Sequence, residues 1–256
     1  MTSRWDGATY ASVGELQRAL ATAEIDAVAW RGDERVLDVG CGDGAMTARI
    51  AGHVPRGEVL GVDSADAQIA YATREHAAAN LRFEVQDAAE VRSPWPADVV
   101  TSFNALHWVP DLDRALARIG GAAAPGGRLV VRAVAHVQRQ SLESVIYVVC
   151  TGPRWAARFS GFASPVNHRT RDDWVALVTA VGFTGVSAEV EDSTWDFGSR
   201  AGFAGWLRGN VGAWSLRLTE DEIDPFVQDV LTAYEPVGGA EGRFRFYQLR
   251  LHATRG

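Results

Sequence analysis

The sequence predicts an α/β fold, a doubly wound and mostly parallel seven-stranded sheet that carries a helical, aromatic-rich lid insertion. First, short apolar runs alternate with helical patterns over residues 35–135, which is typical of parallel strands joined by crossover helices. Second, glycines and polar side chains follow these runs directly, at the edge where open α/β sheets bind ligands. Third, alternating segments at 184–194 and 243–254 add two further strands near the end of the chain.

Helices are expected to precede the sheet. Apolar residues at helical spacing over 16–28 place one or two helices there, so we assign 1–34 to an N-terminal helical flap and 35–256 to the main domain. Two lid segments are expected in that domain, at about 138–170 and 196–237, because insertions there lie over the ligand-binding edge. The remaining predicted elements are strands at 36–39, 59–62, 81–85, 98–103 and 128–131, and helices at 138–150, at 172–181 and within 199–236.

Composition narrows the class of function. A chain of 256 residues favours one domain with an insertion, and a net charge of −7 disfavours a nucleic-acid partner, because a polyanion requires a basic face. All 25 basic residues are arginine, so a Schiff-base or P-loop lysine is excluded. The two cysteines and six histidines show neither a disulfide framework nor a metal-ligand pattern. No apolar run suits a membrane span, so we expect a cytoplasmic monomer or homodimer with a small-molecule substrate.

A glycine-rich turn joins the first predicted strand to the helical pattern behind it. Gly40, Gly42 and Gly44 stand at alternate positions after the apolar run 36–39. Glycine suits such a turn because it adopts positive φ and lets backbone N–H groups approach a ligand. The spacing also satisfies the loose dinucleotide fingerprint, so the turn alone admits NAD, FAD and S-adenosylmethionine (SAM).

Polar residues at the ends of the following strands point to a single site. Asp63 ends the second strand, where its carboxylate can accept hydrogen bonds from ribose hydroxyls; a helix cap ahead of Ser64 is the alternative. Asp87 ends the third strand and can cap the turn that begins at Ala88. The run 104–108 (Asn-Ala-Leu-His-Trp) follows the fourth strand. Because the carboxyl ends of parallel strands share one edge, we expect these residues to lie together.

This ordered series of motifs resembles that of the class I SAM-dependent methyltransferases, whose fold is Rossmann-like, over about residues 34–135. The motifs that carry the resemblance are Asp38–Gly44, Asp63, Asp87, the end of the fourth strand and the turn Pro125–Gly127. Within that superfamily the chain is most similar to the carboxyl methyltransferases typified by juvenile hormone acid and trans-aconitate methyltransferases. The narrower resemblance rests on Tyr10, Leu16-Gln17-Arg18, Ser102–Val109, Ser164-Pro165 and Val181–Phe183.

The resemblance implies SAM as the cofactor and S-adenosylhomocysteine (SAH) as the product. It also gives Asp87 a second interpretation, a contact with the adenine amino group. The residues expected to hold the cofactor are Asp38, Gly40, Cys41, Gly42, Asp63, Ser64, Asp87, Ala88 and Asn104.

The chemistry favours a carboxylic acid as methyl acceptor. Methyl transfer from SAM is an in-line displacement that needs an aligned nucleophile in a water-poor pocket. A carboxylate is ionised at pH 7, so it needs hydrogen-bond donors and no base. Gln17 and Trp108 offer such donors, and they match the glutamine and tryptophan that hold the carboxylate in the resembling enzymes. We therefore predict them as catalytic residues in the O-methylation of a small, apolar acid, although a solvent-facing Gln17 and a packing role for Trp108 stay open.

Other hypotheses keep the cofactor or the fold but change the reaction. His107, the third candidate catalytic residue, either orients the acceptor or acts as base for a hydroxyl, amine or carbon. A SAM-binding cyclase or regulator that transfers no methyl group uses the same scaffold, and a nicotinamide dehydrogenase is the weakest alternative.

Aromatic residues suggest the type of acceptor. A terpenoid, fatty or polyketide-like acid of secondary metabolism is favoured over a polyacid, because no spare pair of arginines is visibly dedicated to a second carboxylate. Arginines such as Arg154, Arg158 and Arg169 could still serve one. Most aromatic residues of the lid are expected to form its own core, and a few to line the pocket. The predicted substrate contacts are Trp5, Tyr10, Trp155, Phe162 and Trp206, and no metal is expected.

Overall fold

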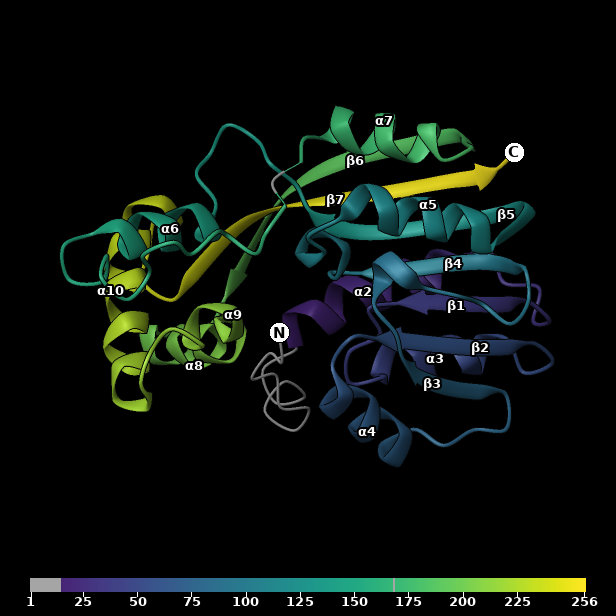
Figure 1. Cartoon of the computed structure of the whole chain (residues 1–256), viewed down its shortest axis with the longest axis horizontal. Helices are drawn as coiled ribbons and strands as arrows, with labels where there is room; N and C mark the ends of the chain where they lie inside the picture. The colour runs from purple at the N-terminus through teal and green to yellow at the C-terminus, as the bar shows by residue number, and fades with distance from the viewer. Residues whose placement is uncertain (1–14, 168) are drawn as a thin grey trace.

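A seven-stranded sheet organises the protein (Figure 1). The structure is a computed structural model that describes residues 15–167 and 169–256. The strands run in the order β3-β2-β1-β4-β5-β7-β6; β1 to β5 are parallel, and β7 lies antiparallel between β5 and β6. This confirms the predicted fold class. The strands are β1 Arg35–Val39, β2 Glu58–Asp63, β3 Leu81–Val85, β4 Ala97–Phe103, β5 Ala123–Val134, β6 Phe183–Asp196 and β7 Arg243–Arg255.

Helices cover both faces of the sheet, and a second group of helices lies beyond its edge (Figure 1). Over the described residues, no helix is both long and apolar enough to cross a membrane. The helices that accompany the sheet are α2 Glu15–Ala27, α3 Ala45–His53, α4 Asp66–Glu75, α5 Leu112–Ala122 and α7 Arg171–Ala180, with two short 3-10 helices, η1 Ala88–Glu90 and η2 Leu106–Trp108. The second group consists of α6 Leu142–Thr151, α8 Arg200–Asn210, α9 Gly212–Ser215 and α10 Glu220–Gly238, and we call it the helical module.

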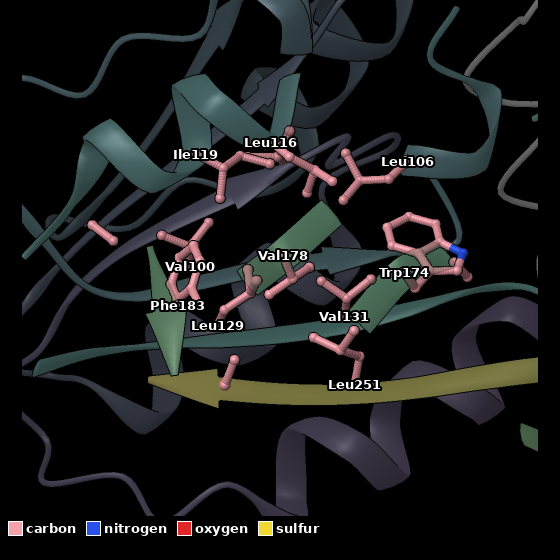
Figure 2. Packing of buried hydrophobic residues seen from close by; sticks show 14 of the residues in the cluster. Val100, Leu106, Leu116, Ile119, Leu129, Val131, Trp174, Val178, Phe183 and Leu251 are labelled. Atoms are coloured by element: carbon pink, nitrogen blue, oxygen red, sulfur yellow. The ribbon is translucent and has the colours of Figure 1, made fainter. Parts of the chain in front are cut away.

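Successive side chains of each strand point to opposite faces of the sheet, so the sheet has a core layer on each face. Leu37 points into a cluster that contains Leu116 of α5 and Trp174 of α7, whereas its neighbour Val36 points into a cluster with Ile25 of α2. Figure 2 shows the first layer, with the side chains of α5 and α7 gathered over the strands. Because both faces are covered, the central strands are apolar on both sides, as the sequence indicates.

Two long strands connect the sheet to the helical module. The pairing of β5 with β7 ends at Val134↔Gln248, but the pairing of β6 with β7 continues to Asp196↔Arg243. This extension carries Phe244 and Phe246 into the aromatic core of the module. The long β6–β7 ribbon is visible in Figure 1, reaching from the sheet to α8 and α10.

A buried carboxylate anchors α2 to the sheet. Glu24, 1% exposed, accepts hydrogen bonds from His252 at 2.6 Å, Arg250 at 2.8 Å and Arg132 at 3.1 Å. Burial alone would raise the pKa of Glu24, but the hydrogen bonds from His252, Arg250 and Arg132 lower it to about 2. Glu24 therefore stays ionised and holds the helix that carries Gln17.

We expect Glu24→Gln to lower the free energy of unfolding by about 3 kcal/mol, because it leaves the buried guanidinium of Arg132 undercompensated. The pKa of Glu24 is depressed in the folded state, so its contribution is complete above the unfolded pKa of about 4.5 and is lost as the pH falls toward 2. Urea denaturation between pH 3 and pH 7 measures both effects. Glu75→Gln, at an exposed residue, is the matched control, and an equal loss in the two variants would contradict the anchoring role.

Candidate active site

Three glycines with positive φ shape the turn after β1. Gly40, Gly42 and Gly44 have φ of 77°, 54° and 80°. A Cβ on Gly40 would lie 2.1 Å from the Cβ of Ala105, so the turn packs directly on the segment that follows β4. Because β1 and β4 are neighbours in the sheet, this close approach places the two loops side by side at its carboxyl edge.

The backbone N–H groups of this turn are occupied within the protein. Those of residues 40 and 41 donate to the carbonyl of Val62 at 2.8 and 3.0 Å, and that of Gly42 donates to Oδ2 of Asp63 at 3.0 Å. At the start of α3, Oδ1 of Asp43 accepts a further N–H at 3.1 Å. The expectation that these groups approach a ligand is therefore wrong; they fasten the turn to the end of β2.

The internal hydrogen bonds of this turn distinguish it from a dinucleotide-binding loop. In such loops the backbone N–H groups and the helix N-terminus bind the pyrophosphate. Here the corresponding donors of residues 40–42 are satisfied by Val62 and Asp63. The arrangement suits a nucleoside without phosphate, such as SAM, and it disfavours NAD and FAD.

Asp63 lies where the turn meets β2. Besides the bond from Gly42, it accepts the N–H of Ala65 at 2.9 Å. Burial raises the pKa of Asp63 above its ordinary value, although these N–H groups lower it in part. A carboxylate oxygen accepts more than one hydrogen bond, so Asp63 keeps capacity for ribose hydroxyls.

Asp38 lies beneath the turn. Its two oxygens accept the hydroxyls of Thr47 on α3 and Thr101 on β4, each at 2.7 Å, and the residue is 2% exposed. Burial raises the pKa of Asp38 to about 6, against the lowering effect of the two hydroxyls. Asp38 was predicted to hold the cofactor, but in this geometry it fixes α3 and β4 against β1.

The remaining predicted cofactor residues lie along the same edge. Asp87 caps η1, accepting the N–H of Ala89 at 2.8 Å, so the capping alternative is present and the adenine contact stays a prediction. Ser64 is exposed and Ala88 is partly exposed. Cys41 is buried, and burial raises the pKa of its thiol well above the ordinary value.

The segment after β4 presents three polar side chains. Asn104 has a φ of 55°, unusual for a residue with a side chain, and its Oδ1 accepts the amide of Gln248 at 3.0 Å. His107 is 3% exposed, and its Nδ1 accepts the N–H of Val134 at 3.4 Å. That bond assigns the neutral ring as the tautomer protonated at Nε2. The Trp108 ring meets Trp214 edge-on, with 5.8 Å between centroids.

A cavity of about 100 Å³ lies between this segment, α2, β7 and the helical module. Of the predicted site residues it brings together Gln17, Asn104, His107, Trp108 and Trp206. Most of the remaining wall is apolar or aromatic, and it includes Leu16, Leu20, Leu142, Ile146, Leu207, Trp214, Phe244 and Phe246. The site therefore joins residues from both halves of the protein.

Gln17 is held in place on the cavity wall. Its Nε2 donates to Oδ1 of Asn210 at 3.3 Å, and its Oε1 accepts the indole N–H of Trp206 at 3.5 Å. Gln17 thus faces the cavity and not open solvent, and its amide retains a second N–H.

Not all predicted substrate residues reach this cavity. Trp155 and Phe162 pack within the helical module and do not line it; the indole of Trp155 donates to Asp229 at 2.8 Å. Trp5 and Tyr10 lie outside the described residues. Across residues 15–167 and 169–256, no group of His, Cys, Asp and Glu side chains could hold a metal ion.

Several wall residues were not predicted. Arg139 and Arg245 both line the cavity, so an arginine pair lies on its wall. Both bond to Asp192, which lies far away in the sequence, and no local pattern signals this cluster. Gln248 had a usable signal, because it occupies an inward position of an alternating strand, two residues after the buried Phe246.

We expect Gly40→Ala to weaken SAH binding at least tenfold and to destabilise the fold by about 1–3 kcal/mol, because the added Cβ overlaps Ala105 at a positive φ. Titration calorimetry and thermal denaturation measure the two effects. Gly121→Ala is the control, since nothing lies within 4 Å of a Cβ there. Unchanged SAH affinity in Gly40→Ala would contradict the role assigned to the turn.

Known proteins resemble this chain in sequence and in fold. Residues 37–129 match a family model described as a methyltransferase domain. A trans-aconitate 2-methyltransferase of Methylobacterium nodulans is 28% identical over 238 residues, covering 90% of this chain and 87% of that protein. One from Deinococcus radiodurans is 41% identical over 102 residues, covering 40% of this chain and 38% of that protein. The crystal structure of YcgJ from Bacillus subtilis shares the fold, with a TM-score of 0.67 at 16% identity, over 93% of this chain and 98% of that one. Together these findings support a SAM-dependent methyltransferase of the class I fold.

Proposed function

We propose that the protein transfers the methyl group of SAM to the carboxylate of a small, mainly apolar acid and releases a methyl ester and SAH. The observation that carries this proposal is the meeting of Gln17 from α2 and Trp108 from the β4 end on one mostly apolar cavity. The similarity to trans-aconitate 2-methyltransferases supports a carboxylate as acceptor.

The cofactor fits the edge formed by the turn after β1 and the end of β2. The oxygens of Asp63 would accept the ribose hydroxyls, and Asn104 would lie between the cofactor and the acceptor cavity. When bound, SAM supplies a methyl group already activated by the sulfonium charge. The protein's own contribution is to align the acceptor and to exclude water.

Gln17 and Trp108 would hold the acceptor carboxylate with hydrogen bonds. The bonds that Gln17 makes to Asn210 and Trp206 fix the plane of its amide, so that its second N–H has a defined direction. Neither an amide nor an indole gives up its proton at neutral pH, so the acceptor keeps its negative charge. Hydrogen bonds to a charged group are worth about 1.5–3 kcal/mol.

The position of His107 argues against a base. Its Nδ1 accepts a backbone N–H, so the other ring nitrogen carries a proton in the neutral form and has no lone pair to receive one. This favours an acceptor that is already ionised over a hydroxyl or an amine. The carbonyl of His107 also accepts the N–H of Asn167 at 2.7 Å, which ties the β4 end to the segment before α7.

The helical module would act as a lid over the acceptor. Trp206, Leu207 and Trp214 come from it and close one side of the cavity, opposite the strand ends. Aromatic walls of this kind exclude water and suit an apolar acid.

We expect Gln17→Ala and Trp108→Phe each to reduce kcat for an acid substrate by roughly 10- to 100-fold, because each removes one donor to the carboxylate. The affinity for SAH should change less than threefold, since neither residue lies at the turn after β1. Methyl-ester formation from a panel of carboxylic acids, followed by mass spectrometry, and calorimetry with SAH measure the two quantities.

Trp95→Phe is the matched control for the indole. The Trp95 indole N–H is buried without a hydrogen-bond partner in the described structure, and the residue does not line the cavity. Equal loss of turnover and of SAH affinity in Gln17→Ala and Trp108→Phe would contradict the assignment of these residues to the acceptor.

We expect kcat/KM for an acid substrate to stay constant from about pH 5.5 to pH 8.5, because the nucleophile, with a pKa of about 4.5, is mostly ionised throughout. A fall below about pH 6.5 that disappears in His107→Asn would favour an imidazole base. A fall that persists in this variant would point to Asp38, whose pKa burial raises to about 6.

A further inference from the structure

Two buried amides on the cavity wall each leave one polar atom without a partner. Gln248 is 3% exposed, and its Nε2 donates to Oδ1 of Asn104 at 3.0 Å. The remaining atoms, Oε1 of Gln248 and Nδ2 of Asn104, are buried and make no hydrogen bond within the described residues. Both residues line the cavity that holds Gln17 and Trp108. Because buried polar atoms are usually satisfied, two such atoms on one wall point to a ligand group.

The pair offers one acceptor and one donor next to each other. If both amide groups are rotated by 180°, the oxygen and nitrogen of each exchange places. One donor and one acceptor then still lack a partner, so the pair offers the same two groups in either assignment. A carboxylate has only acceptors and would be repelled by the amide oxygen. A hydroxyl group both donates and accepts, and it satisfies the two atoms together.

Besides the arginines that bond to Asp192, the wall contains two polar regions relevant to an acceptor. Gln17 and Trp108 present donors, which suit an anion, whereas Gln248 and Asn104 present a mixed pair, which suits a neutral hydroxyl. The two regions belong to one cavity, so a single acceptor molecule can reach both. Apolar side chains occupy much of the remaining wall.

We infer that Gln248 and Asn104 select an acceptor that carries a hydroxyl group in addition to its carboxylate, so that the preferred substrate is a hydroxy acid. This inference rests on the proposed function for the carboxylate. The hydroxyl donates to Oε1 of Gln248 and accepts from Nδ2 of Asn104, and it takes no part in the methyl transfer. Gln248 is thus a specificity-determining residue that β7 contributes to the site.

The test compares octanoic acid with 2-, 3- and 8-hydroxyoctanoic acid. Binding to the SAH-loaded protein is measured by calorimetry, separately from turnover with SAM. We expect at least one hydroxy acid to bind ten times more tightly than octanoic acid, because a site with buried polar groups rejects an analogue that leaves them unpaired. Gln248→Met, which keeps the length of the side chain and removes its amide, should reduce that preference to less than threefold.

Gln68→Met is the matched control. Gln68 is 4% exposed, its Oε1 also lacks a partner among the described residues, and it lies on α4 outside the cavity, so its variant should keep the hydroxyl preference. Equal binding of all four acids by the unmodified protein, or a preference retained in Gln248→Met, would overturn the inference. Loss of SAH affinity in Gln248→Met would also overturn it, by assigning the pair to the cofactor. Tight binding of a hydroxy acid without methylation would support the inference and refute the proposed carboxyl transfer.

Discussion

The ion-pair network around Glu24 is the interaction that holds α2, and with it one wall of the cavity, against the sheet. It fixes α2, which contacts the helical module and the sheet. Leu16 packs in the aromatic core of the module, and Ile25 packs in the core layer of the sheet that contains Val36. Gln17 precedes Glu24 by seven residues, about two helical turns, so the two side chains lie on one face of the helix. Anchoring the carboxylate at one end of α2 therefore sets the direction in which Gln17 presents its amide at the other.

The β6–β7 ribbon plays the corresponding role for the opposite wall. For about half of its length β7 pairs with both β5 and β6, within the sheet. Over the rest it pairs with β6 alone and packs against the helical module. Gln248 lies at the last pair between β5 and β7, where the change occurs. The cavity lies at this junction, so the strand ends, α2 and the helical module all contribute residues to its wall.

Much of the sheet and its ligand edge was predictable from the sequence, because both follow from local patterns. The apolar runs fix the strands, and the glycines with Asp63 mark the edge next to β1. The internal use of the N–H groups of residues 40–42 was not predictable, because the carbonyl of Val62 becomes their acceptor only when β2 lies beside β1. The residues that line the cavity were harder to predict from the sequence. Gln17 was identified by resemblance alone, and the arginines near Asp192 meet only through the pairing of distant strands.

The internally bonded turn has a consequence for selectivity inside a cell. ATP, ADP and the nicotinamide coenzymes share the adenosine moiety of SAM and are abundant competitors for any adenosine pocket. A phosphate placed at this turn would find the donors of Gly40, Cys41 and Gly42 already engaged, and it would lie near the carboxylates of Asp43 and Asp63. The turn thus offers no unengaged donor at residues 40–42 to the charge of a phosphorylated adenosine compound, which would favour SAM over such compounds.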